Sequence, residues 1–183
     1  MKDMKEMYIH EIMKDEIDID KLSEIDPALS VLKYCTQENN FHELSLWEHT
    51  KKVIEYLPKK LLERVSANYH DTGKYYTSTF NARGYQCFLG HEKKSAEIAE
   101  SSLRMLGFGK ELIIPAVRII RYHDAKVRLT SESIRKLMGK IGPEYCDAFL
   151  AFKEADILAH SDAYKKDIIP IFNEIKRIYN LIK

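Results

Sequence analysis

The chain has 183 residues, 45% of them hydrophobic and 31% charged, which is the balance of a globular domain with a sizeable core. Its 29 basic residues nearly match its 28 acidic residues, and the net charge of +1 excludes the strongly basic footprint of a dedicated nucleic-acid-binding protein. The three cysteines are far apart and include no Cys-x-x-Cys pair, which argues against a disulfide framework or a zinc ribbon and favours a reducing compartment.

Residues 1–25 form a charged leader that we expect to be helical or loosely ordered, followed by one domain at 26–183. The leader is too charged for a signal peptide, and no apolar run approaches the roughly 18 residues of a membrane span. We therefore expect a cytoplasmic protein with no membrane partner. The Asp-Ile-Asp sequence at 18–20 follows no Gly-Ser loop or sheet, and we interpret it as a solvated charge run.

Helical spacing dominates the rest of the chain, where seven segments carry apolar residues at three- and four-residue steps. We therefore predict an all-α fold, a bundle of about six or seven helices. Pro115 falls where a helix interior should be, so it lies in a first turn or kinks the helix, and the last helix is expected after Pro170. The predicted helical segments are 45–58, 59–71, 91–107, 110–124, 131–142, 143–160 and 171–183.

Residues 75–90, with the sequence YYTSTFNARGYQCFLG, break this pattern. They are rich in Thr, Ser, Asn and Gly and predict a long loop, with a short hairpin as one form of it. Long loops inside a compact domain are uncommon and often functional. The interleaved aromatic side chains could stack a nucleic-acid base, although packing within the loop is the simpler interpretation; they are Tyr75, Tyr76, Phe80, Tyr85 and Phe88.

Four histidines and one aspartate lie on or near the apolar faces of five different predicted helices. A single core histidine is usually just hydrogen-bonded, and a single buried aspartate can cap a helix, because an unpaired buried carboxylate is costly. Five such positions in one small domain are better explained by a shared metal ion, since imidazole and carboxylate are ligands of zinc, iron, manganese, nickel and cobalt. These residues are His49, His70, His91, His123 and Asp156.

The neighbouring residues His70 and Asp71 stand where a predicted helix ends. Adjacent helical residues point about 100° apart, so the two side chains can share an ion only if it lies between their directions. Gly73 is expected to let the backbone turn away at this point and to leave room for a substrate.

The order His49, then His70-Asp71, then Asp156 resembles the HD superfamily of metal-dependent phosphohydrolases. Three segments narrow the resemblance to the HD domain of bacterial CCA-adding tRNA nucleotidyltransferases, with a similarity that spans residues 25–165. They are LSLWEHTKKVIEYLP, HDTGKYYTSTFNARGYQCFLGHEKKSAEIAESSLRMLGF and KEADILAHSDAY. No nucleotidyltransferase head domain is expected before it, so the resemblance implies the phosphohydrolase module and not nucleotide addition.

The resemblance implies one or two divalent ions, drawn from Fe, Mn, Ni, Co, Zn or Mg. It assigns the first ion to His49, His70, Asp71 and Asp156, with Asp71 as the bridging and catalytic carboxylate. It assigns the second ion to His91 and His123. The substrate would be a nucleotide or a small phosphate ester, either a phosphomonoester or a 2′,3′-cyclic phosphodiester, hydrolysed by metal-activated water.

Other residues are weaker candidates. Lys74 is expected to hold a substrate phosphate or to assist the leaving group, and Arg83 and His42 are further substrate-binding candidates. Asp124 is either a third ligand of the second ion or a helix cap, and His160 supports the site or the fold.

Three other functions compete with this interpretation. One is a metal-retaining binding or regulatory module with little turnover, and another is a diadenosine polyphosphate hydrolase. The third is an RNA-associated accessory domain, which the near-neutral charge disfavours.

Overall fold

The structure is a computed structural model that describes residues 3–35 and 44–183. The described ranges contain eleven α-helices, two short 3-10 helices and one two-stranded sheet. In chain order these elements are α1 (Met4–Ile12), α2 (Ile19–Ile25), η1 (Pro27–Ser30), α3 (Val31–Tyr34), α4 (Leu46–Tyr56), α5 (Leu61–Tyr69), α6 (Lys74–Thr77), β1 (Thr79–Phe80), β2 (Gln86–Cys87), α7 (His91–Met105), α8 (Lys110–Tyr122), α9 (Ser131–Ile141), η2 (Pro143–Tyr145), α10 (Cys146–Leu158) and α11 (Asp162–Ile182).

The predicted all-α class is confirmed, and each of the seven predicted helices is present as α4, α5, α7, α8, α9, α10 or α11. The four further α-helices, α1, α2, α3 and α6, raise the count above the predicted six or seven. Two of them, α3 and α6, have only four residues, too few to show an apolar period in a sequence. None of the helices in the described ranges combines the length and apolarity of a membrane span.

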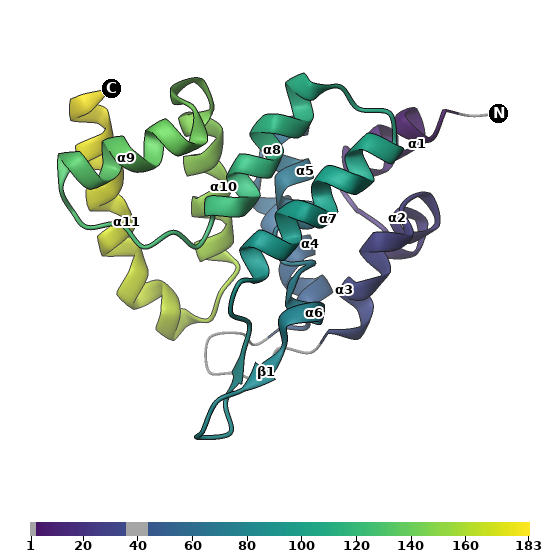
Figure 1. The fold of residues 1–183 in the computed structure, drawn as a ribbon, viewed down its shortest axis with the longest axis horizontal. Helices are drawn as coiled ribbons and strands as arrows, with labels where there is room; N and C mark the ends of the chain where they lie inside the picture. The colour runs from purple at the N-terminus through teal and green to yellow at the C-terminus, as the bar shows by residue number, and fades with distance from the viewer. Residues whose placement is uncertain (1–2, 36–43) are drawn as a thin grey trace.

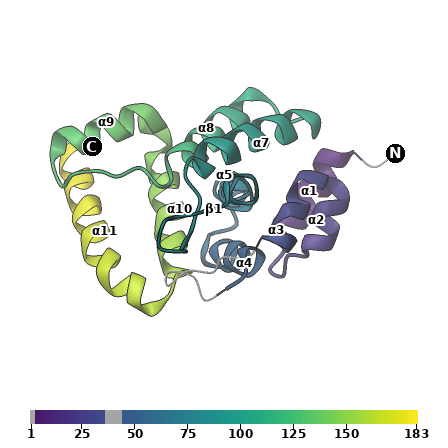
Figure 2. The same cartoon turned by 60° about the horizontal axis from the view of Figure 1, so that its bottom comes forward.

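Helix α5 lies at the centre of the molecule, with α4, α7, α8 and α10 around it (Figure 2). Helices α7 and α8 run alongside each other over α5, and α9 and α11 extend the bundle beyond α10 (Figures 1 and 2). The core between them is made of fully buried apolar side chains such as Val65 on α5, Leu103 on α7 and Phe152 on α10. The C-terminal ends of α5 and α8 lie close together inside the bundle.

The charged leader is helical and packs onto the bundle. Tyr8 on α1 is fully buried, its ring stacks on Tyr69 of α5 at 6.2 Å, and its hydroxyl accepts a hydrogen bond from Asn68 at 2.8 Å. Arg64 on α5 donates from Nη1 to the carbonyl oxygens of Ile12 and Lys14. The buried apolar residues of the leader belong to the same core cluster as those of the bundle. The division of the chain at residue 25 stays a prediction.

Side-chain caps explain where two of these helices begin. Ser45 and Glu48 form a reciprocal capping box at the start of α4. Asp18, the first residue of the Asp-Ile-Asp sequence, accepts hydrogen bonds from the backbone of Asp20 and Lys21 and so caps α2. A helix cap is a structural role, which agrees with the interpretation of this sequence as non-catalytic.

The predicted start of the last helix after Pro170 is wrong. Helix α11 begins at Asp162, where Ser161 accepts a hydrogen bond from the backbone of Tyr164, and Pro170 lies inside it. A proline removes one backbone donor from a helix interior, but buried residues beyond it, including Phe172, anchor the helix against the bundle. Pro115 likewise lies inside α8, beyond its first turn.

The segment predicted as a long loop contains α6 and a small antiparallel hairpin. Thr79 pairs with Cys87 and Phe80 pairs with Gln86. Gly84 makes the turn with a φ of 77°, a conformation that favours glycine. The hairpin projects from the bottom of the bundle (Figure 1).

Candidate metal centre

His49 and Asp156 come together from α4 and α10. Both side chains are buried, and Nε2 of His49 lies 3.2 Å from Oδ1 of Asp156. Nε2 of His49 also lies 3.8 Å from Oδ2 of Asp71. Two residues 107 positions apart in the chain therefore present an imidazole and a carboxylate to one point in the core.

The adjacent residues His70 and Asp71 follow the last turn of α5 and are both buried. Nε2 of His70 is 3.1 Å from Oδ2 of Asp71 and 3.9 Å from Oδ1 of Asp156. The two neighbours thus point to a common space at the end of the helix, as their position in the sequence suggested.

Two further histidines approach Asp71 from its other side. His91 is the first residue of α7, and His123 follows the last turn of α8. Their Nε2 atoms lie 3.3 Å and 3.7 Å from Oδ1 of Asp71 and 3.2 Å from each other. Oδ2 of Asp71 faces His70, so its two oxygens face two different sets of histidines.

Six buried side chains in the described ranges therefore form two adjacent groups, each able to hold a metal ion. Within each group the ligand atoms all lie within 4.8 Å of one another. The first group is His49, His70 and Asp156, and the second is Asp71, His91 and His123.

Backbone carbonyls fix the orientation of three of the four imidazoles. Nδ1 lies 2.7 Å from the Ala67 carbonyl in His70, 2.8 Å from the Phe88 carbonyl in His91 and 2.7 Å from the Ile120 carbonyl in His123. A carbonyl can only accept, so each Nδ1 carries the proton, and in its neutral form each ring presents the lone pair of Nε2 inwards. This is the arrangement in which proteins usually hold a metal-ligating histidine.

This geometry fits a bound cation. With both rings neutral, the Nε2 lone pairs of His91 and His123 would face each other at 3.2 Å, which is unfavourable unless a proton or a metal ion lies between them. In the described part of the chain, Nε2 of His70 and Oδ1 of Asp71 are buried without a well-aligned hydrogen bond. Buried acceptors of this kind are costly unless something positive binds them.

The surroundings hold the carboxylates ionised. Burial alone would raise the pKa of Asp71, but His70 and Lys74 outweigh it and keep the pKa well below its usual range. The pKa of Asp156 is held low in the same way, with Lys153 as the largest opposing influence. Burial lowers the pKa of His123 to about 4, so this ring is neutral near pH 7. Charged carboxylates and a neutral imidazole are the forms that bind metal ions.

Two lysines contact the carboxylates directly. Nζ of Lys74, a residue singled out in the sequence, lies 2.8 Å from Oδ2 of Asp71. Nζ of Lys153 lies 2.8 Å from Oδ2 of Asp156 and 3.4 Å from Oδ1 of Asp124. The sequence analysis gave Lys153 no role, although its place one helical turn before Asp156 was a usable signal.

Gly73 has a different role from the one expected. Its φ of −67° is helical, and its amide donates to Oγ of Ser95 at 2.8 Å. A Cβ at this position would lie 2.3 Å from the carbonyl oxygen of His91. The absent side chain therefore makes space for the first turn of α7 and leaves no gap for a substrate.

A pocket of about 700 Å³ opens beside the second group. Lys74, His91 and Asp124 lie on its wall, so it reaches the residues around Asp71. Four basic and two acidic side chains line it, together with His91 and aromatic residues. They are Lys74, Lys93, Arg121 and Lys126 against Glu92 and Asp124, and the sequence analysis had not singled out Lys93, Arg121 or Lys126.

The weaker sequence candidates have different positions. Arg83 is exposed at the turn of the hairpin and is not among the residues that line the pocket. His42 lies outside the described residues. Oδ2 of Asp124 is 3.6 Å from Nε2 of His91, which keeps a ligand role open. His160 packs its ring against His49 at 4.8 Å and bonds through Nδ1 to the Asp156 carbonyl at 2.7 Å.

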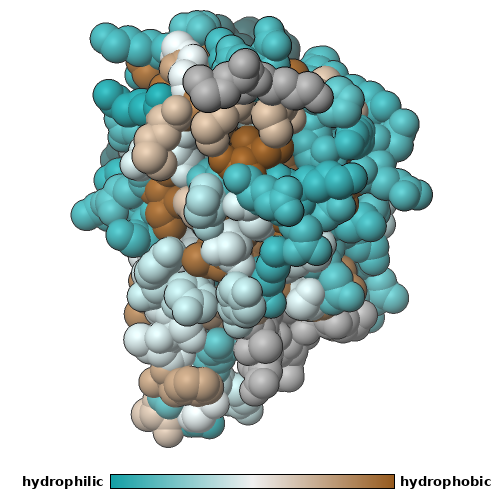
Figure 3. Space-filling model, turned by 90° about the vertical axis from the view of Figure 1, so that its right-hand side faces the viewer, coloured by the Kyte–Doolittle hydropathy of each residue, from teal (hydrophilic) through white to brown (hydrophobic). Residues whose placement is uncertain are grey.

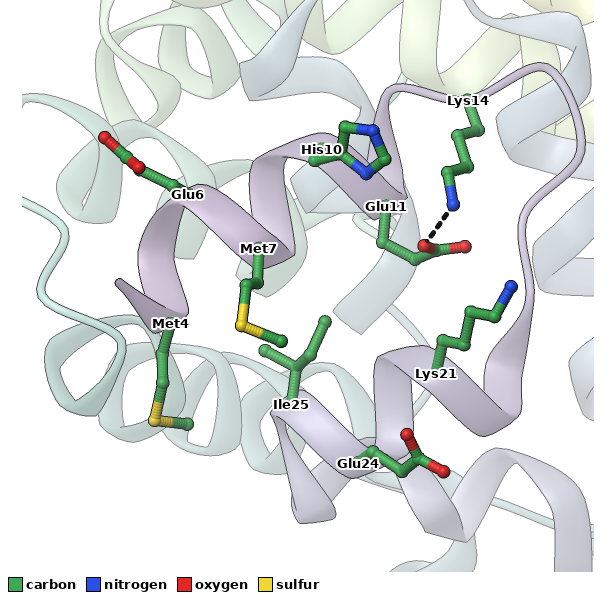
Figure 4. A pocket seen from close by; sticks show the side chains of 9 residues that line it. All are labelled: Met4, Glu6, Met7, His10, Glu11, Lys14, Lys21, Glu24 and Ile25. Atoms are coloured by element: carbon green, nitrogen blue, oxygen red, sulfur yellow. Dashed lines mark hydrogen bonds and ion pairs between the residues drawn. The ribbon is translucent and has the colours of Figure 1, made fainter. Parts of the chain in front are cut away.

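A larger pocket of about 840 Å³ lies away from these groups, between α1 and α2 (Figure 4). Met4, Met7 and Ile25 form its apolar wall, and Glu11 pairs with Lys14 at its edge. None of its lining residues belongs to the two histidine–aspartate groups. Size alone therefore does not mark the functional site, and the convergent ionisable groups do.

An all-α fold that brings His, His-Asp and Asp together from separate helices defines an HD-type metal-binding domain. Residues 41–164 match the family model of the HD domain, which is more than half of the chain, and the chain therefore belongs to this family. HD domains are generally metal-dependent phosphohydrolases, and the resemblance inferred from the sequence is confirmed.

One curated relative is a CC-adding tRNA nucleotidyltransferase from Thermus thermophilus. It is 34% identical to this chain over 116 residues. The match takes in 60% of this chain and 26% of the relative, so the chain spans about a quarter of that protein's length.

Proposed function

We propose that this protein is a metal-dependent phosphohydrolase that acts on a nucleotide or small phosphate ester, either a phosphomonoester or a 2′,3′-cyclic phosphodiester. The observation that carries the proposal is the convergence of two ligand groups on either side of Asp71. Two neighbouring cation sites beside a basic pocket suit in-line displacement at phosphorus, because they can stabilise both the attacking and the leaving oxygen.

In this proposal His49, His70, Asp71 and Asp156 hold the first divalent ion, and His91 and His123 complete a second. Asp71 would contribute to both ions, because Oδ2 faces His70 and Oδ1 faces His91. Nitrogen and oxygen donors of this kind accept Fe, Mn, Ni, Co, Zn or Mg. Such an ion, when bound, supplies hydroxide near neutral pH and offsets the negative charge on the phosphoryl oxygens.

The protein's own residues bind and orient the substrate. The ammonium of Lys74 lies beside Asp71 and on the pocket wall, which suits it to hold a phosphoryl oxygen or to assist the leaving group. Hydrolysis joins a water oxygen to phosphorus, breaks the phosphorus–oxygen bond to the alcohol and delivers a proton to the departing oxygen. The carbonyl bonds of His70, His91 and His123 keep the ligand atoms in place throughout.

Metal analysis together with a substrate panel tests the proposal. The purified protein should bind a transition metal and hydrolyse members of a panel of nucleotides and phosphate esters in the presence of Mn²⁺, Ni²⁺ or Co²⁺. His70→Ala and Asp71→Ala should each lower kcat/KM at least about 100-fold, as expected when the group that positions the ion is removed. His10→Ala, an exposed histidine on α1, is the matched control and should change nothing.

Two results would contradict the proposal. A protein that binds metal but hydrolyses no ester on the panel would be a binding module. A protein whose activity survives both substitutions, with circular dichroism showing an intact fold, would carry its active site elsewhere.

A further inference from the structure

The segment between His70-Asp71 and α7 has an unusual composition for a surface. Residues 72–90 contain no acidic residue and five aromatic ones. Four of these rings are largely exposed in the structure, which leaves apolar faces in contact with solvent. They are Tyr75 (48% exposed), Tyr76 (55%), Phe80 (68%) and Tyr85 (54%).

The pocket beside this segment has cations that no carboxylate neutralises. Lys93, Arg121 and Lys126 line it, and among the described residues none of them makes an ion pair. Of the two acidic residues of the pocket, Asp124 lies 3.4 Å from Nζ of Lys153, so Glu92 alone is left to offset the three cations. The uncompensated charge on the pocket wall is therefore positive.

The hairpin and the pocket form one continuous surface. Gln86 and Cys87 of β2 and Phe88 after it line the pocket, while Phe80 and Tyr85 lie on the same hairpin. In Figure 3 the hairpin is the projection at the bottom of the molecule, and its surface is paler than the deep teal charged region above it. Lys74 lines the same pocket and pairs with the buried Asp71, so the pocket joins the hairpin to the edge of the metal centre.

We propose that this surface binds a single-stranded nucleic acid and presents its terminal phosphate to the metal groups. The bases stack on the rings of the hairpin, and Lys93, Arg121 and Lys126 contact the backbone phosphates. This inference rests on the proposed function and names its substrate class: the phosphorylated end of a strand in place of a free mononucleotide.

The near-neutral net charge does not oppose this assignment, because the charge is unevenly distributed. Residues 1–25 carry eight acidic and four basic side chains, so that segment has a net charge of −4 and the rest of the chain has +5. Aromatic rings beside cations suit a single strand, whose bases are free to stack; the bases of a duplex are already stacked on each other.

Binding to oligonucleotides tests the proposal directly. The probes are fluorescein-labelled ten-nucleotide RNA and DNA strands with a terminal phosphate, and their duplexes, followed by fluorescence anisotropy with the full protein. The double substitution Phe80→Ala with Tyr85→Ala should raise the Kd for single strands at least about tenfold, the usual loss when a stacking ring is removed. Comparison of RNA with DNA shows which sugar the surface prefers.

A matched control uses exposed aromatic residues elsewhere. Tyr34 on α3 and Tyr56 on α4 are 71% and 49% exposed, and Tyr34→Ala with Tyr56→Ala should leave the Kd within about twofold of the parent. Lys93→Ala with Arg121→Ala should reduce the slope of log K against log salt by about 1.4, because each lost phosphate contact contributes about 0.7 for a single strand. A merely structural role for these residues would not change that slope.

The outcomes separate this inference from the proposed function. Equal loss of affinity in the hairpin variant and the control, or duplexes that bind as well as single strands, would overturn the binding surface. So would a hairpin substitution that turns a dimer into a monomer without affecting the Kd, because a second copy would then cover the rings. Hairpin-dependent binding with no hydrolysis of any ester would support the surface and refute only the proposed function.

Discussion

Replacing Gly73 with alanine should destabilise the fold and separate the two ligand groups. The φ of −67° suits any residue, so the lack of a side chain matters only because of space. A Cβ would lie 2.3 Å from the carbonyl oxygen of His91 and 2.7 Å from the amide nitrogen of Ser95, and both atoms belong to the backbone of α7. No side-chain rotation can relieve these contacts, and the first turn of α7 has to move.

The size of the effect follows from the geometry. Bringing the closest contact to 3.0 Å requires a shift of at least about 0.7 Å in the start of α7. Overpacking of this kind costs about 1–3 kcal/mol. The shift also weakens the hydrogen bond from Gly73 to Ser95, which contributes roughly 0.5–1.5 kcal/mol. We therefore expect the free energy of unfolding to fall by about 2–4 kcal/mol, and His91 to move relative to Asp71.

Urea denaturation of the metal-free protein, followed by circular dichroism, measures the loss of stability. Calorimetric titration with Mn²⁺ measures the loss of affinity at the second group. Gly139→Ala is the matched control, since Gly139 is exposed inside α9 with nothing near its Cβ position, and this change should stabilise the protein by about 0.5–1 kcal/mol. If Gly73→Ala equals the parent in stability and titrates identically, the argument from space is wrong.

Three other predictions concern the leader, the thiols and pH. Tyr8→Ala should lower the free energy of unfolding by about 3–5 kcal/mol in urea, because it empties a fully buried site under α1; a change below 1 kcal/mol would show a leader that is not part of the fold. A thiol-specific reagent should modify only half-exposed Cys87 quickly in the native protein, since Cys35 is buried and burial raises the pKa of Cys146 to about 11; rapid reaction of all three would contradict the structure. Burial gives His123 a pKa of about 4 in the folded protein, against 6.5 in the unfolded chain. The contribution of the neutral ring to the free energy of unfolding is therefore fully present above pH 6.5, and about 3 kcal/mol of it is lost as the pH falls towards 4. The stability difference between the metal-free parent and His123→Asn should show this slope, and a difference that is constant with pH would refute it.

Local signals in the sequence were enough to predict most of the fold. Apolar spacing predicted seven helices that the structure contains. The start of α11 was missed because proline is a strong signal in a sequence, whereas the burial of Phe172 that outweighs it depends on packing; the cap at Ser161 was a local signal that the analysis passed over. The same holds for α1, whose burial depends on contacts with a helix more than 50 residues away.

The candidate site was predictable in its residue types and not in its geometry. Imidazoles and carboxylates on separate core faces indicated a metal, and the six named residues do lie together. Nothing local indicated that Lys153 would also reach Asp124, or that Lys126 would line the same pocket as Lys74. These relations arise only when α8 and α10 pack side by side with α5.

The hydrogen bonds from Nδ1 to carbonyls three residues earlier have a consequence for how the centre assembles. Each of the rings at positions 70, 91 and 123 is oriented by a carbonyl of its own turn of backbone, without a contribution from another helix. The three side chains therefore lose little rotational freedom when an ion binds. A mutation in a distant loop leaves these local hydrogen bonds, and so the ring orientations, in place. Local hydrogen bonds thus set the orientation of each ring, and the packing of the helices has only to set the distances between the rings.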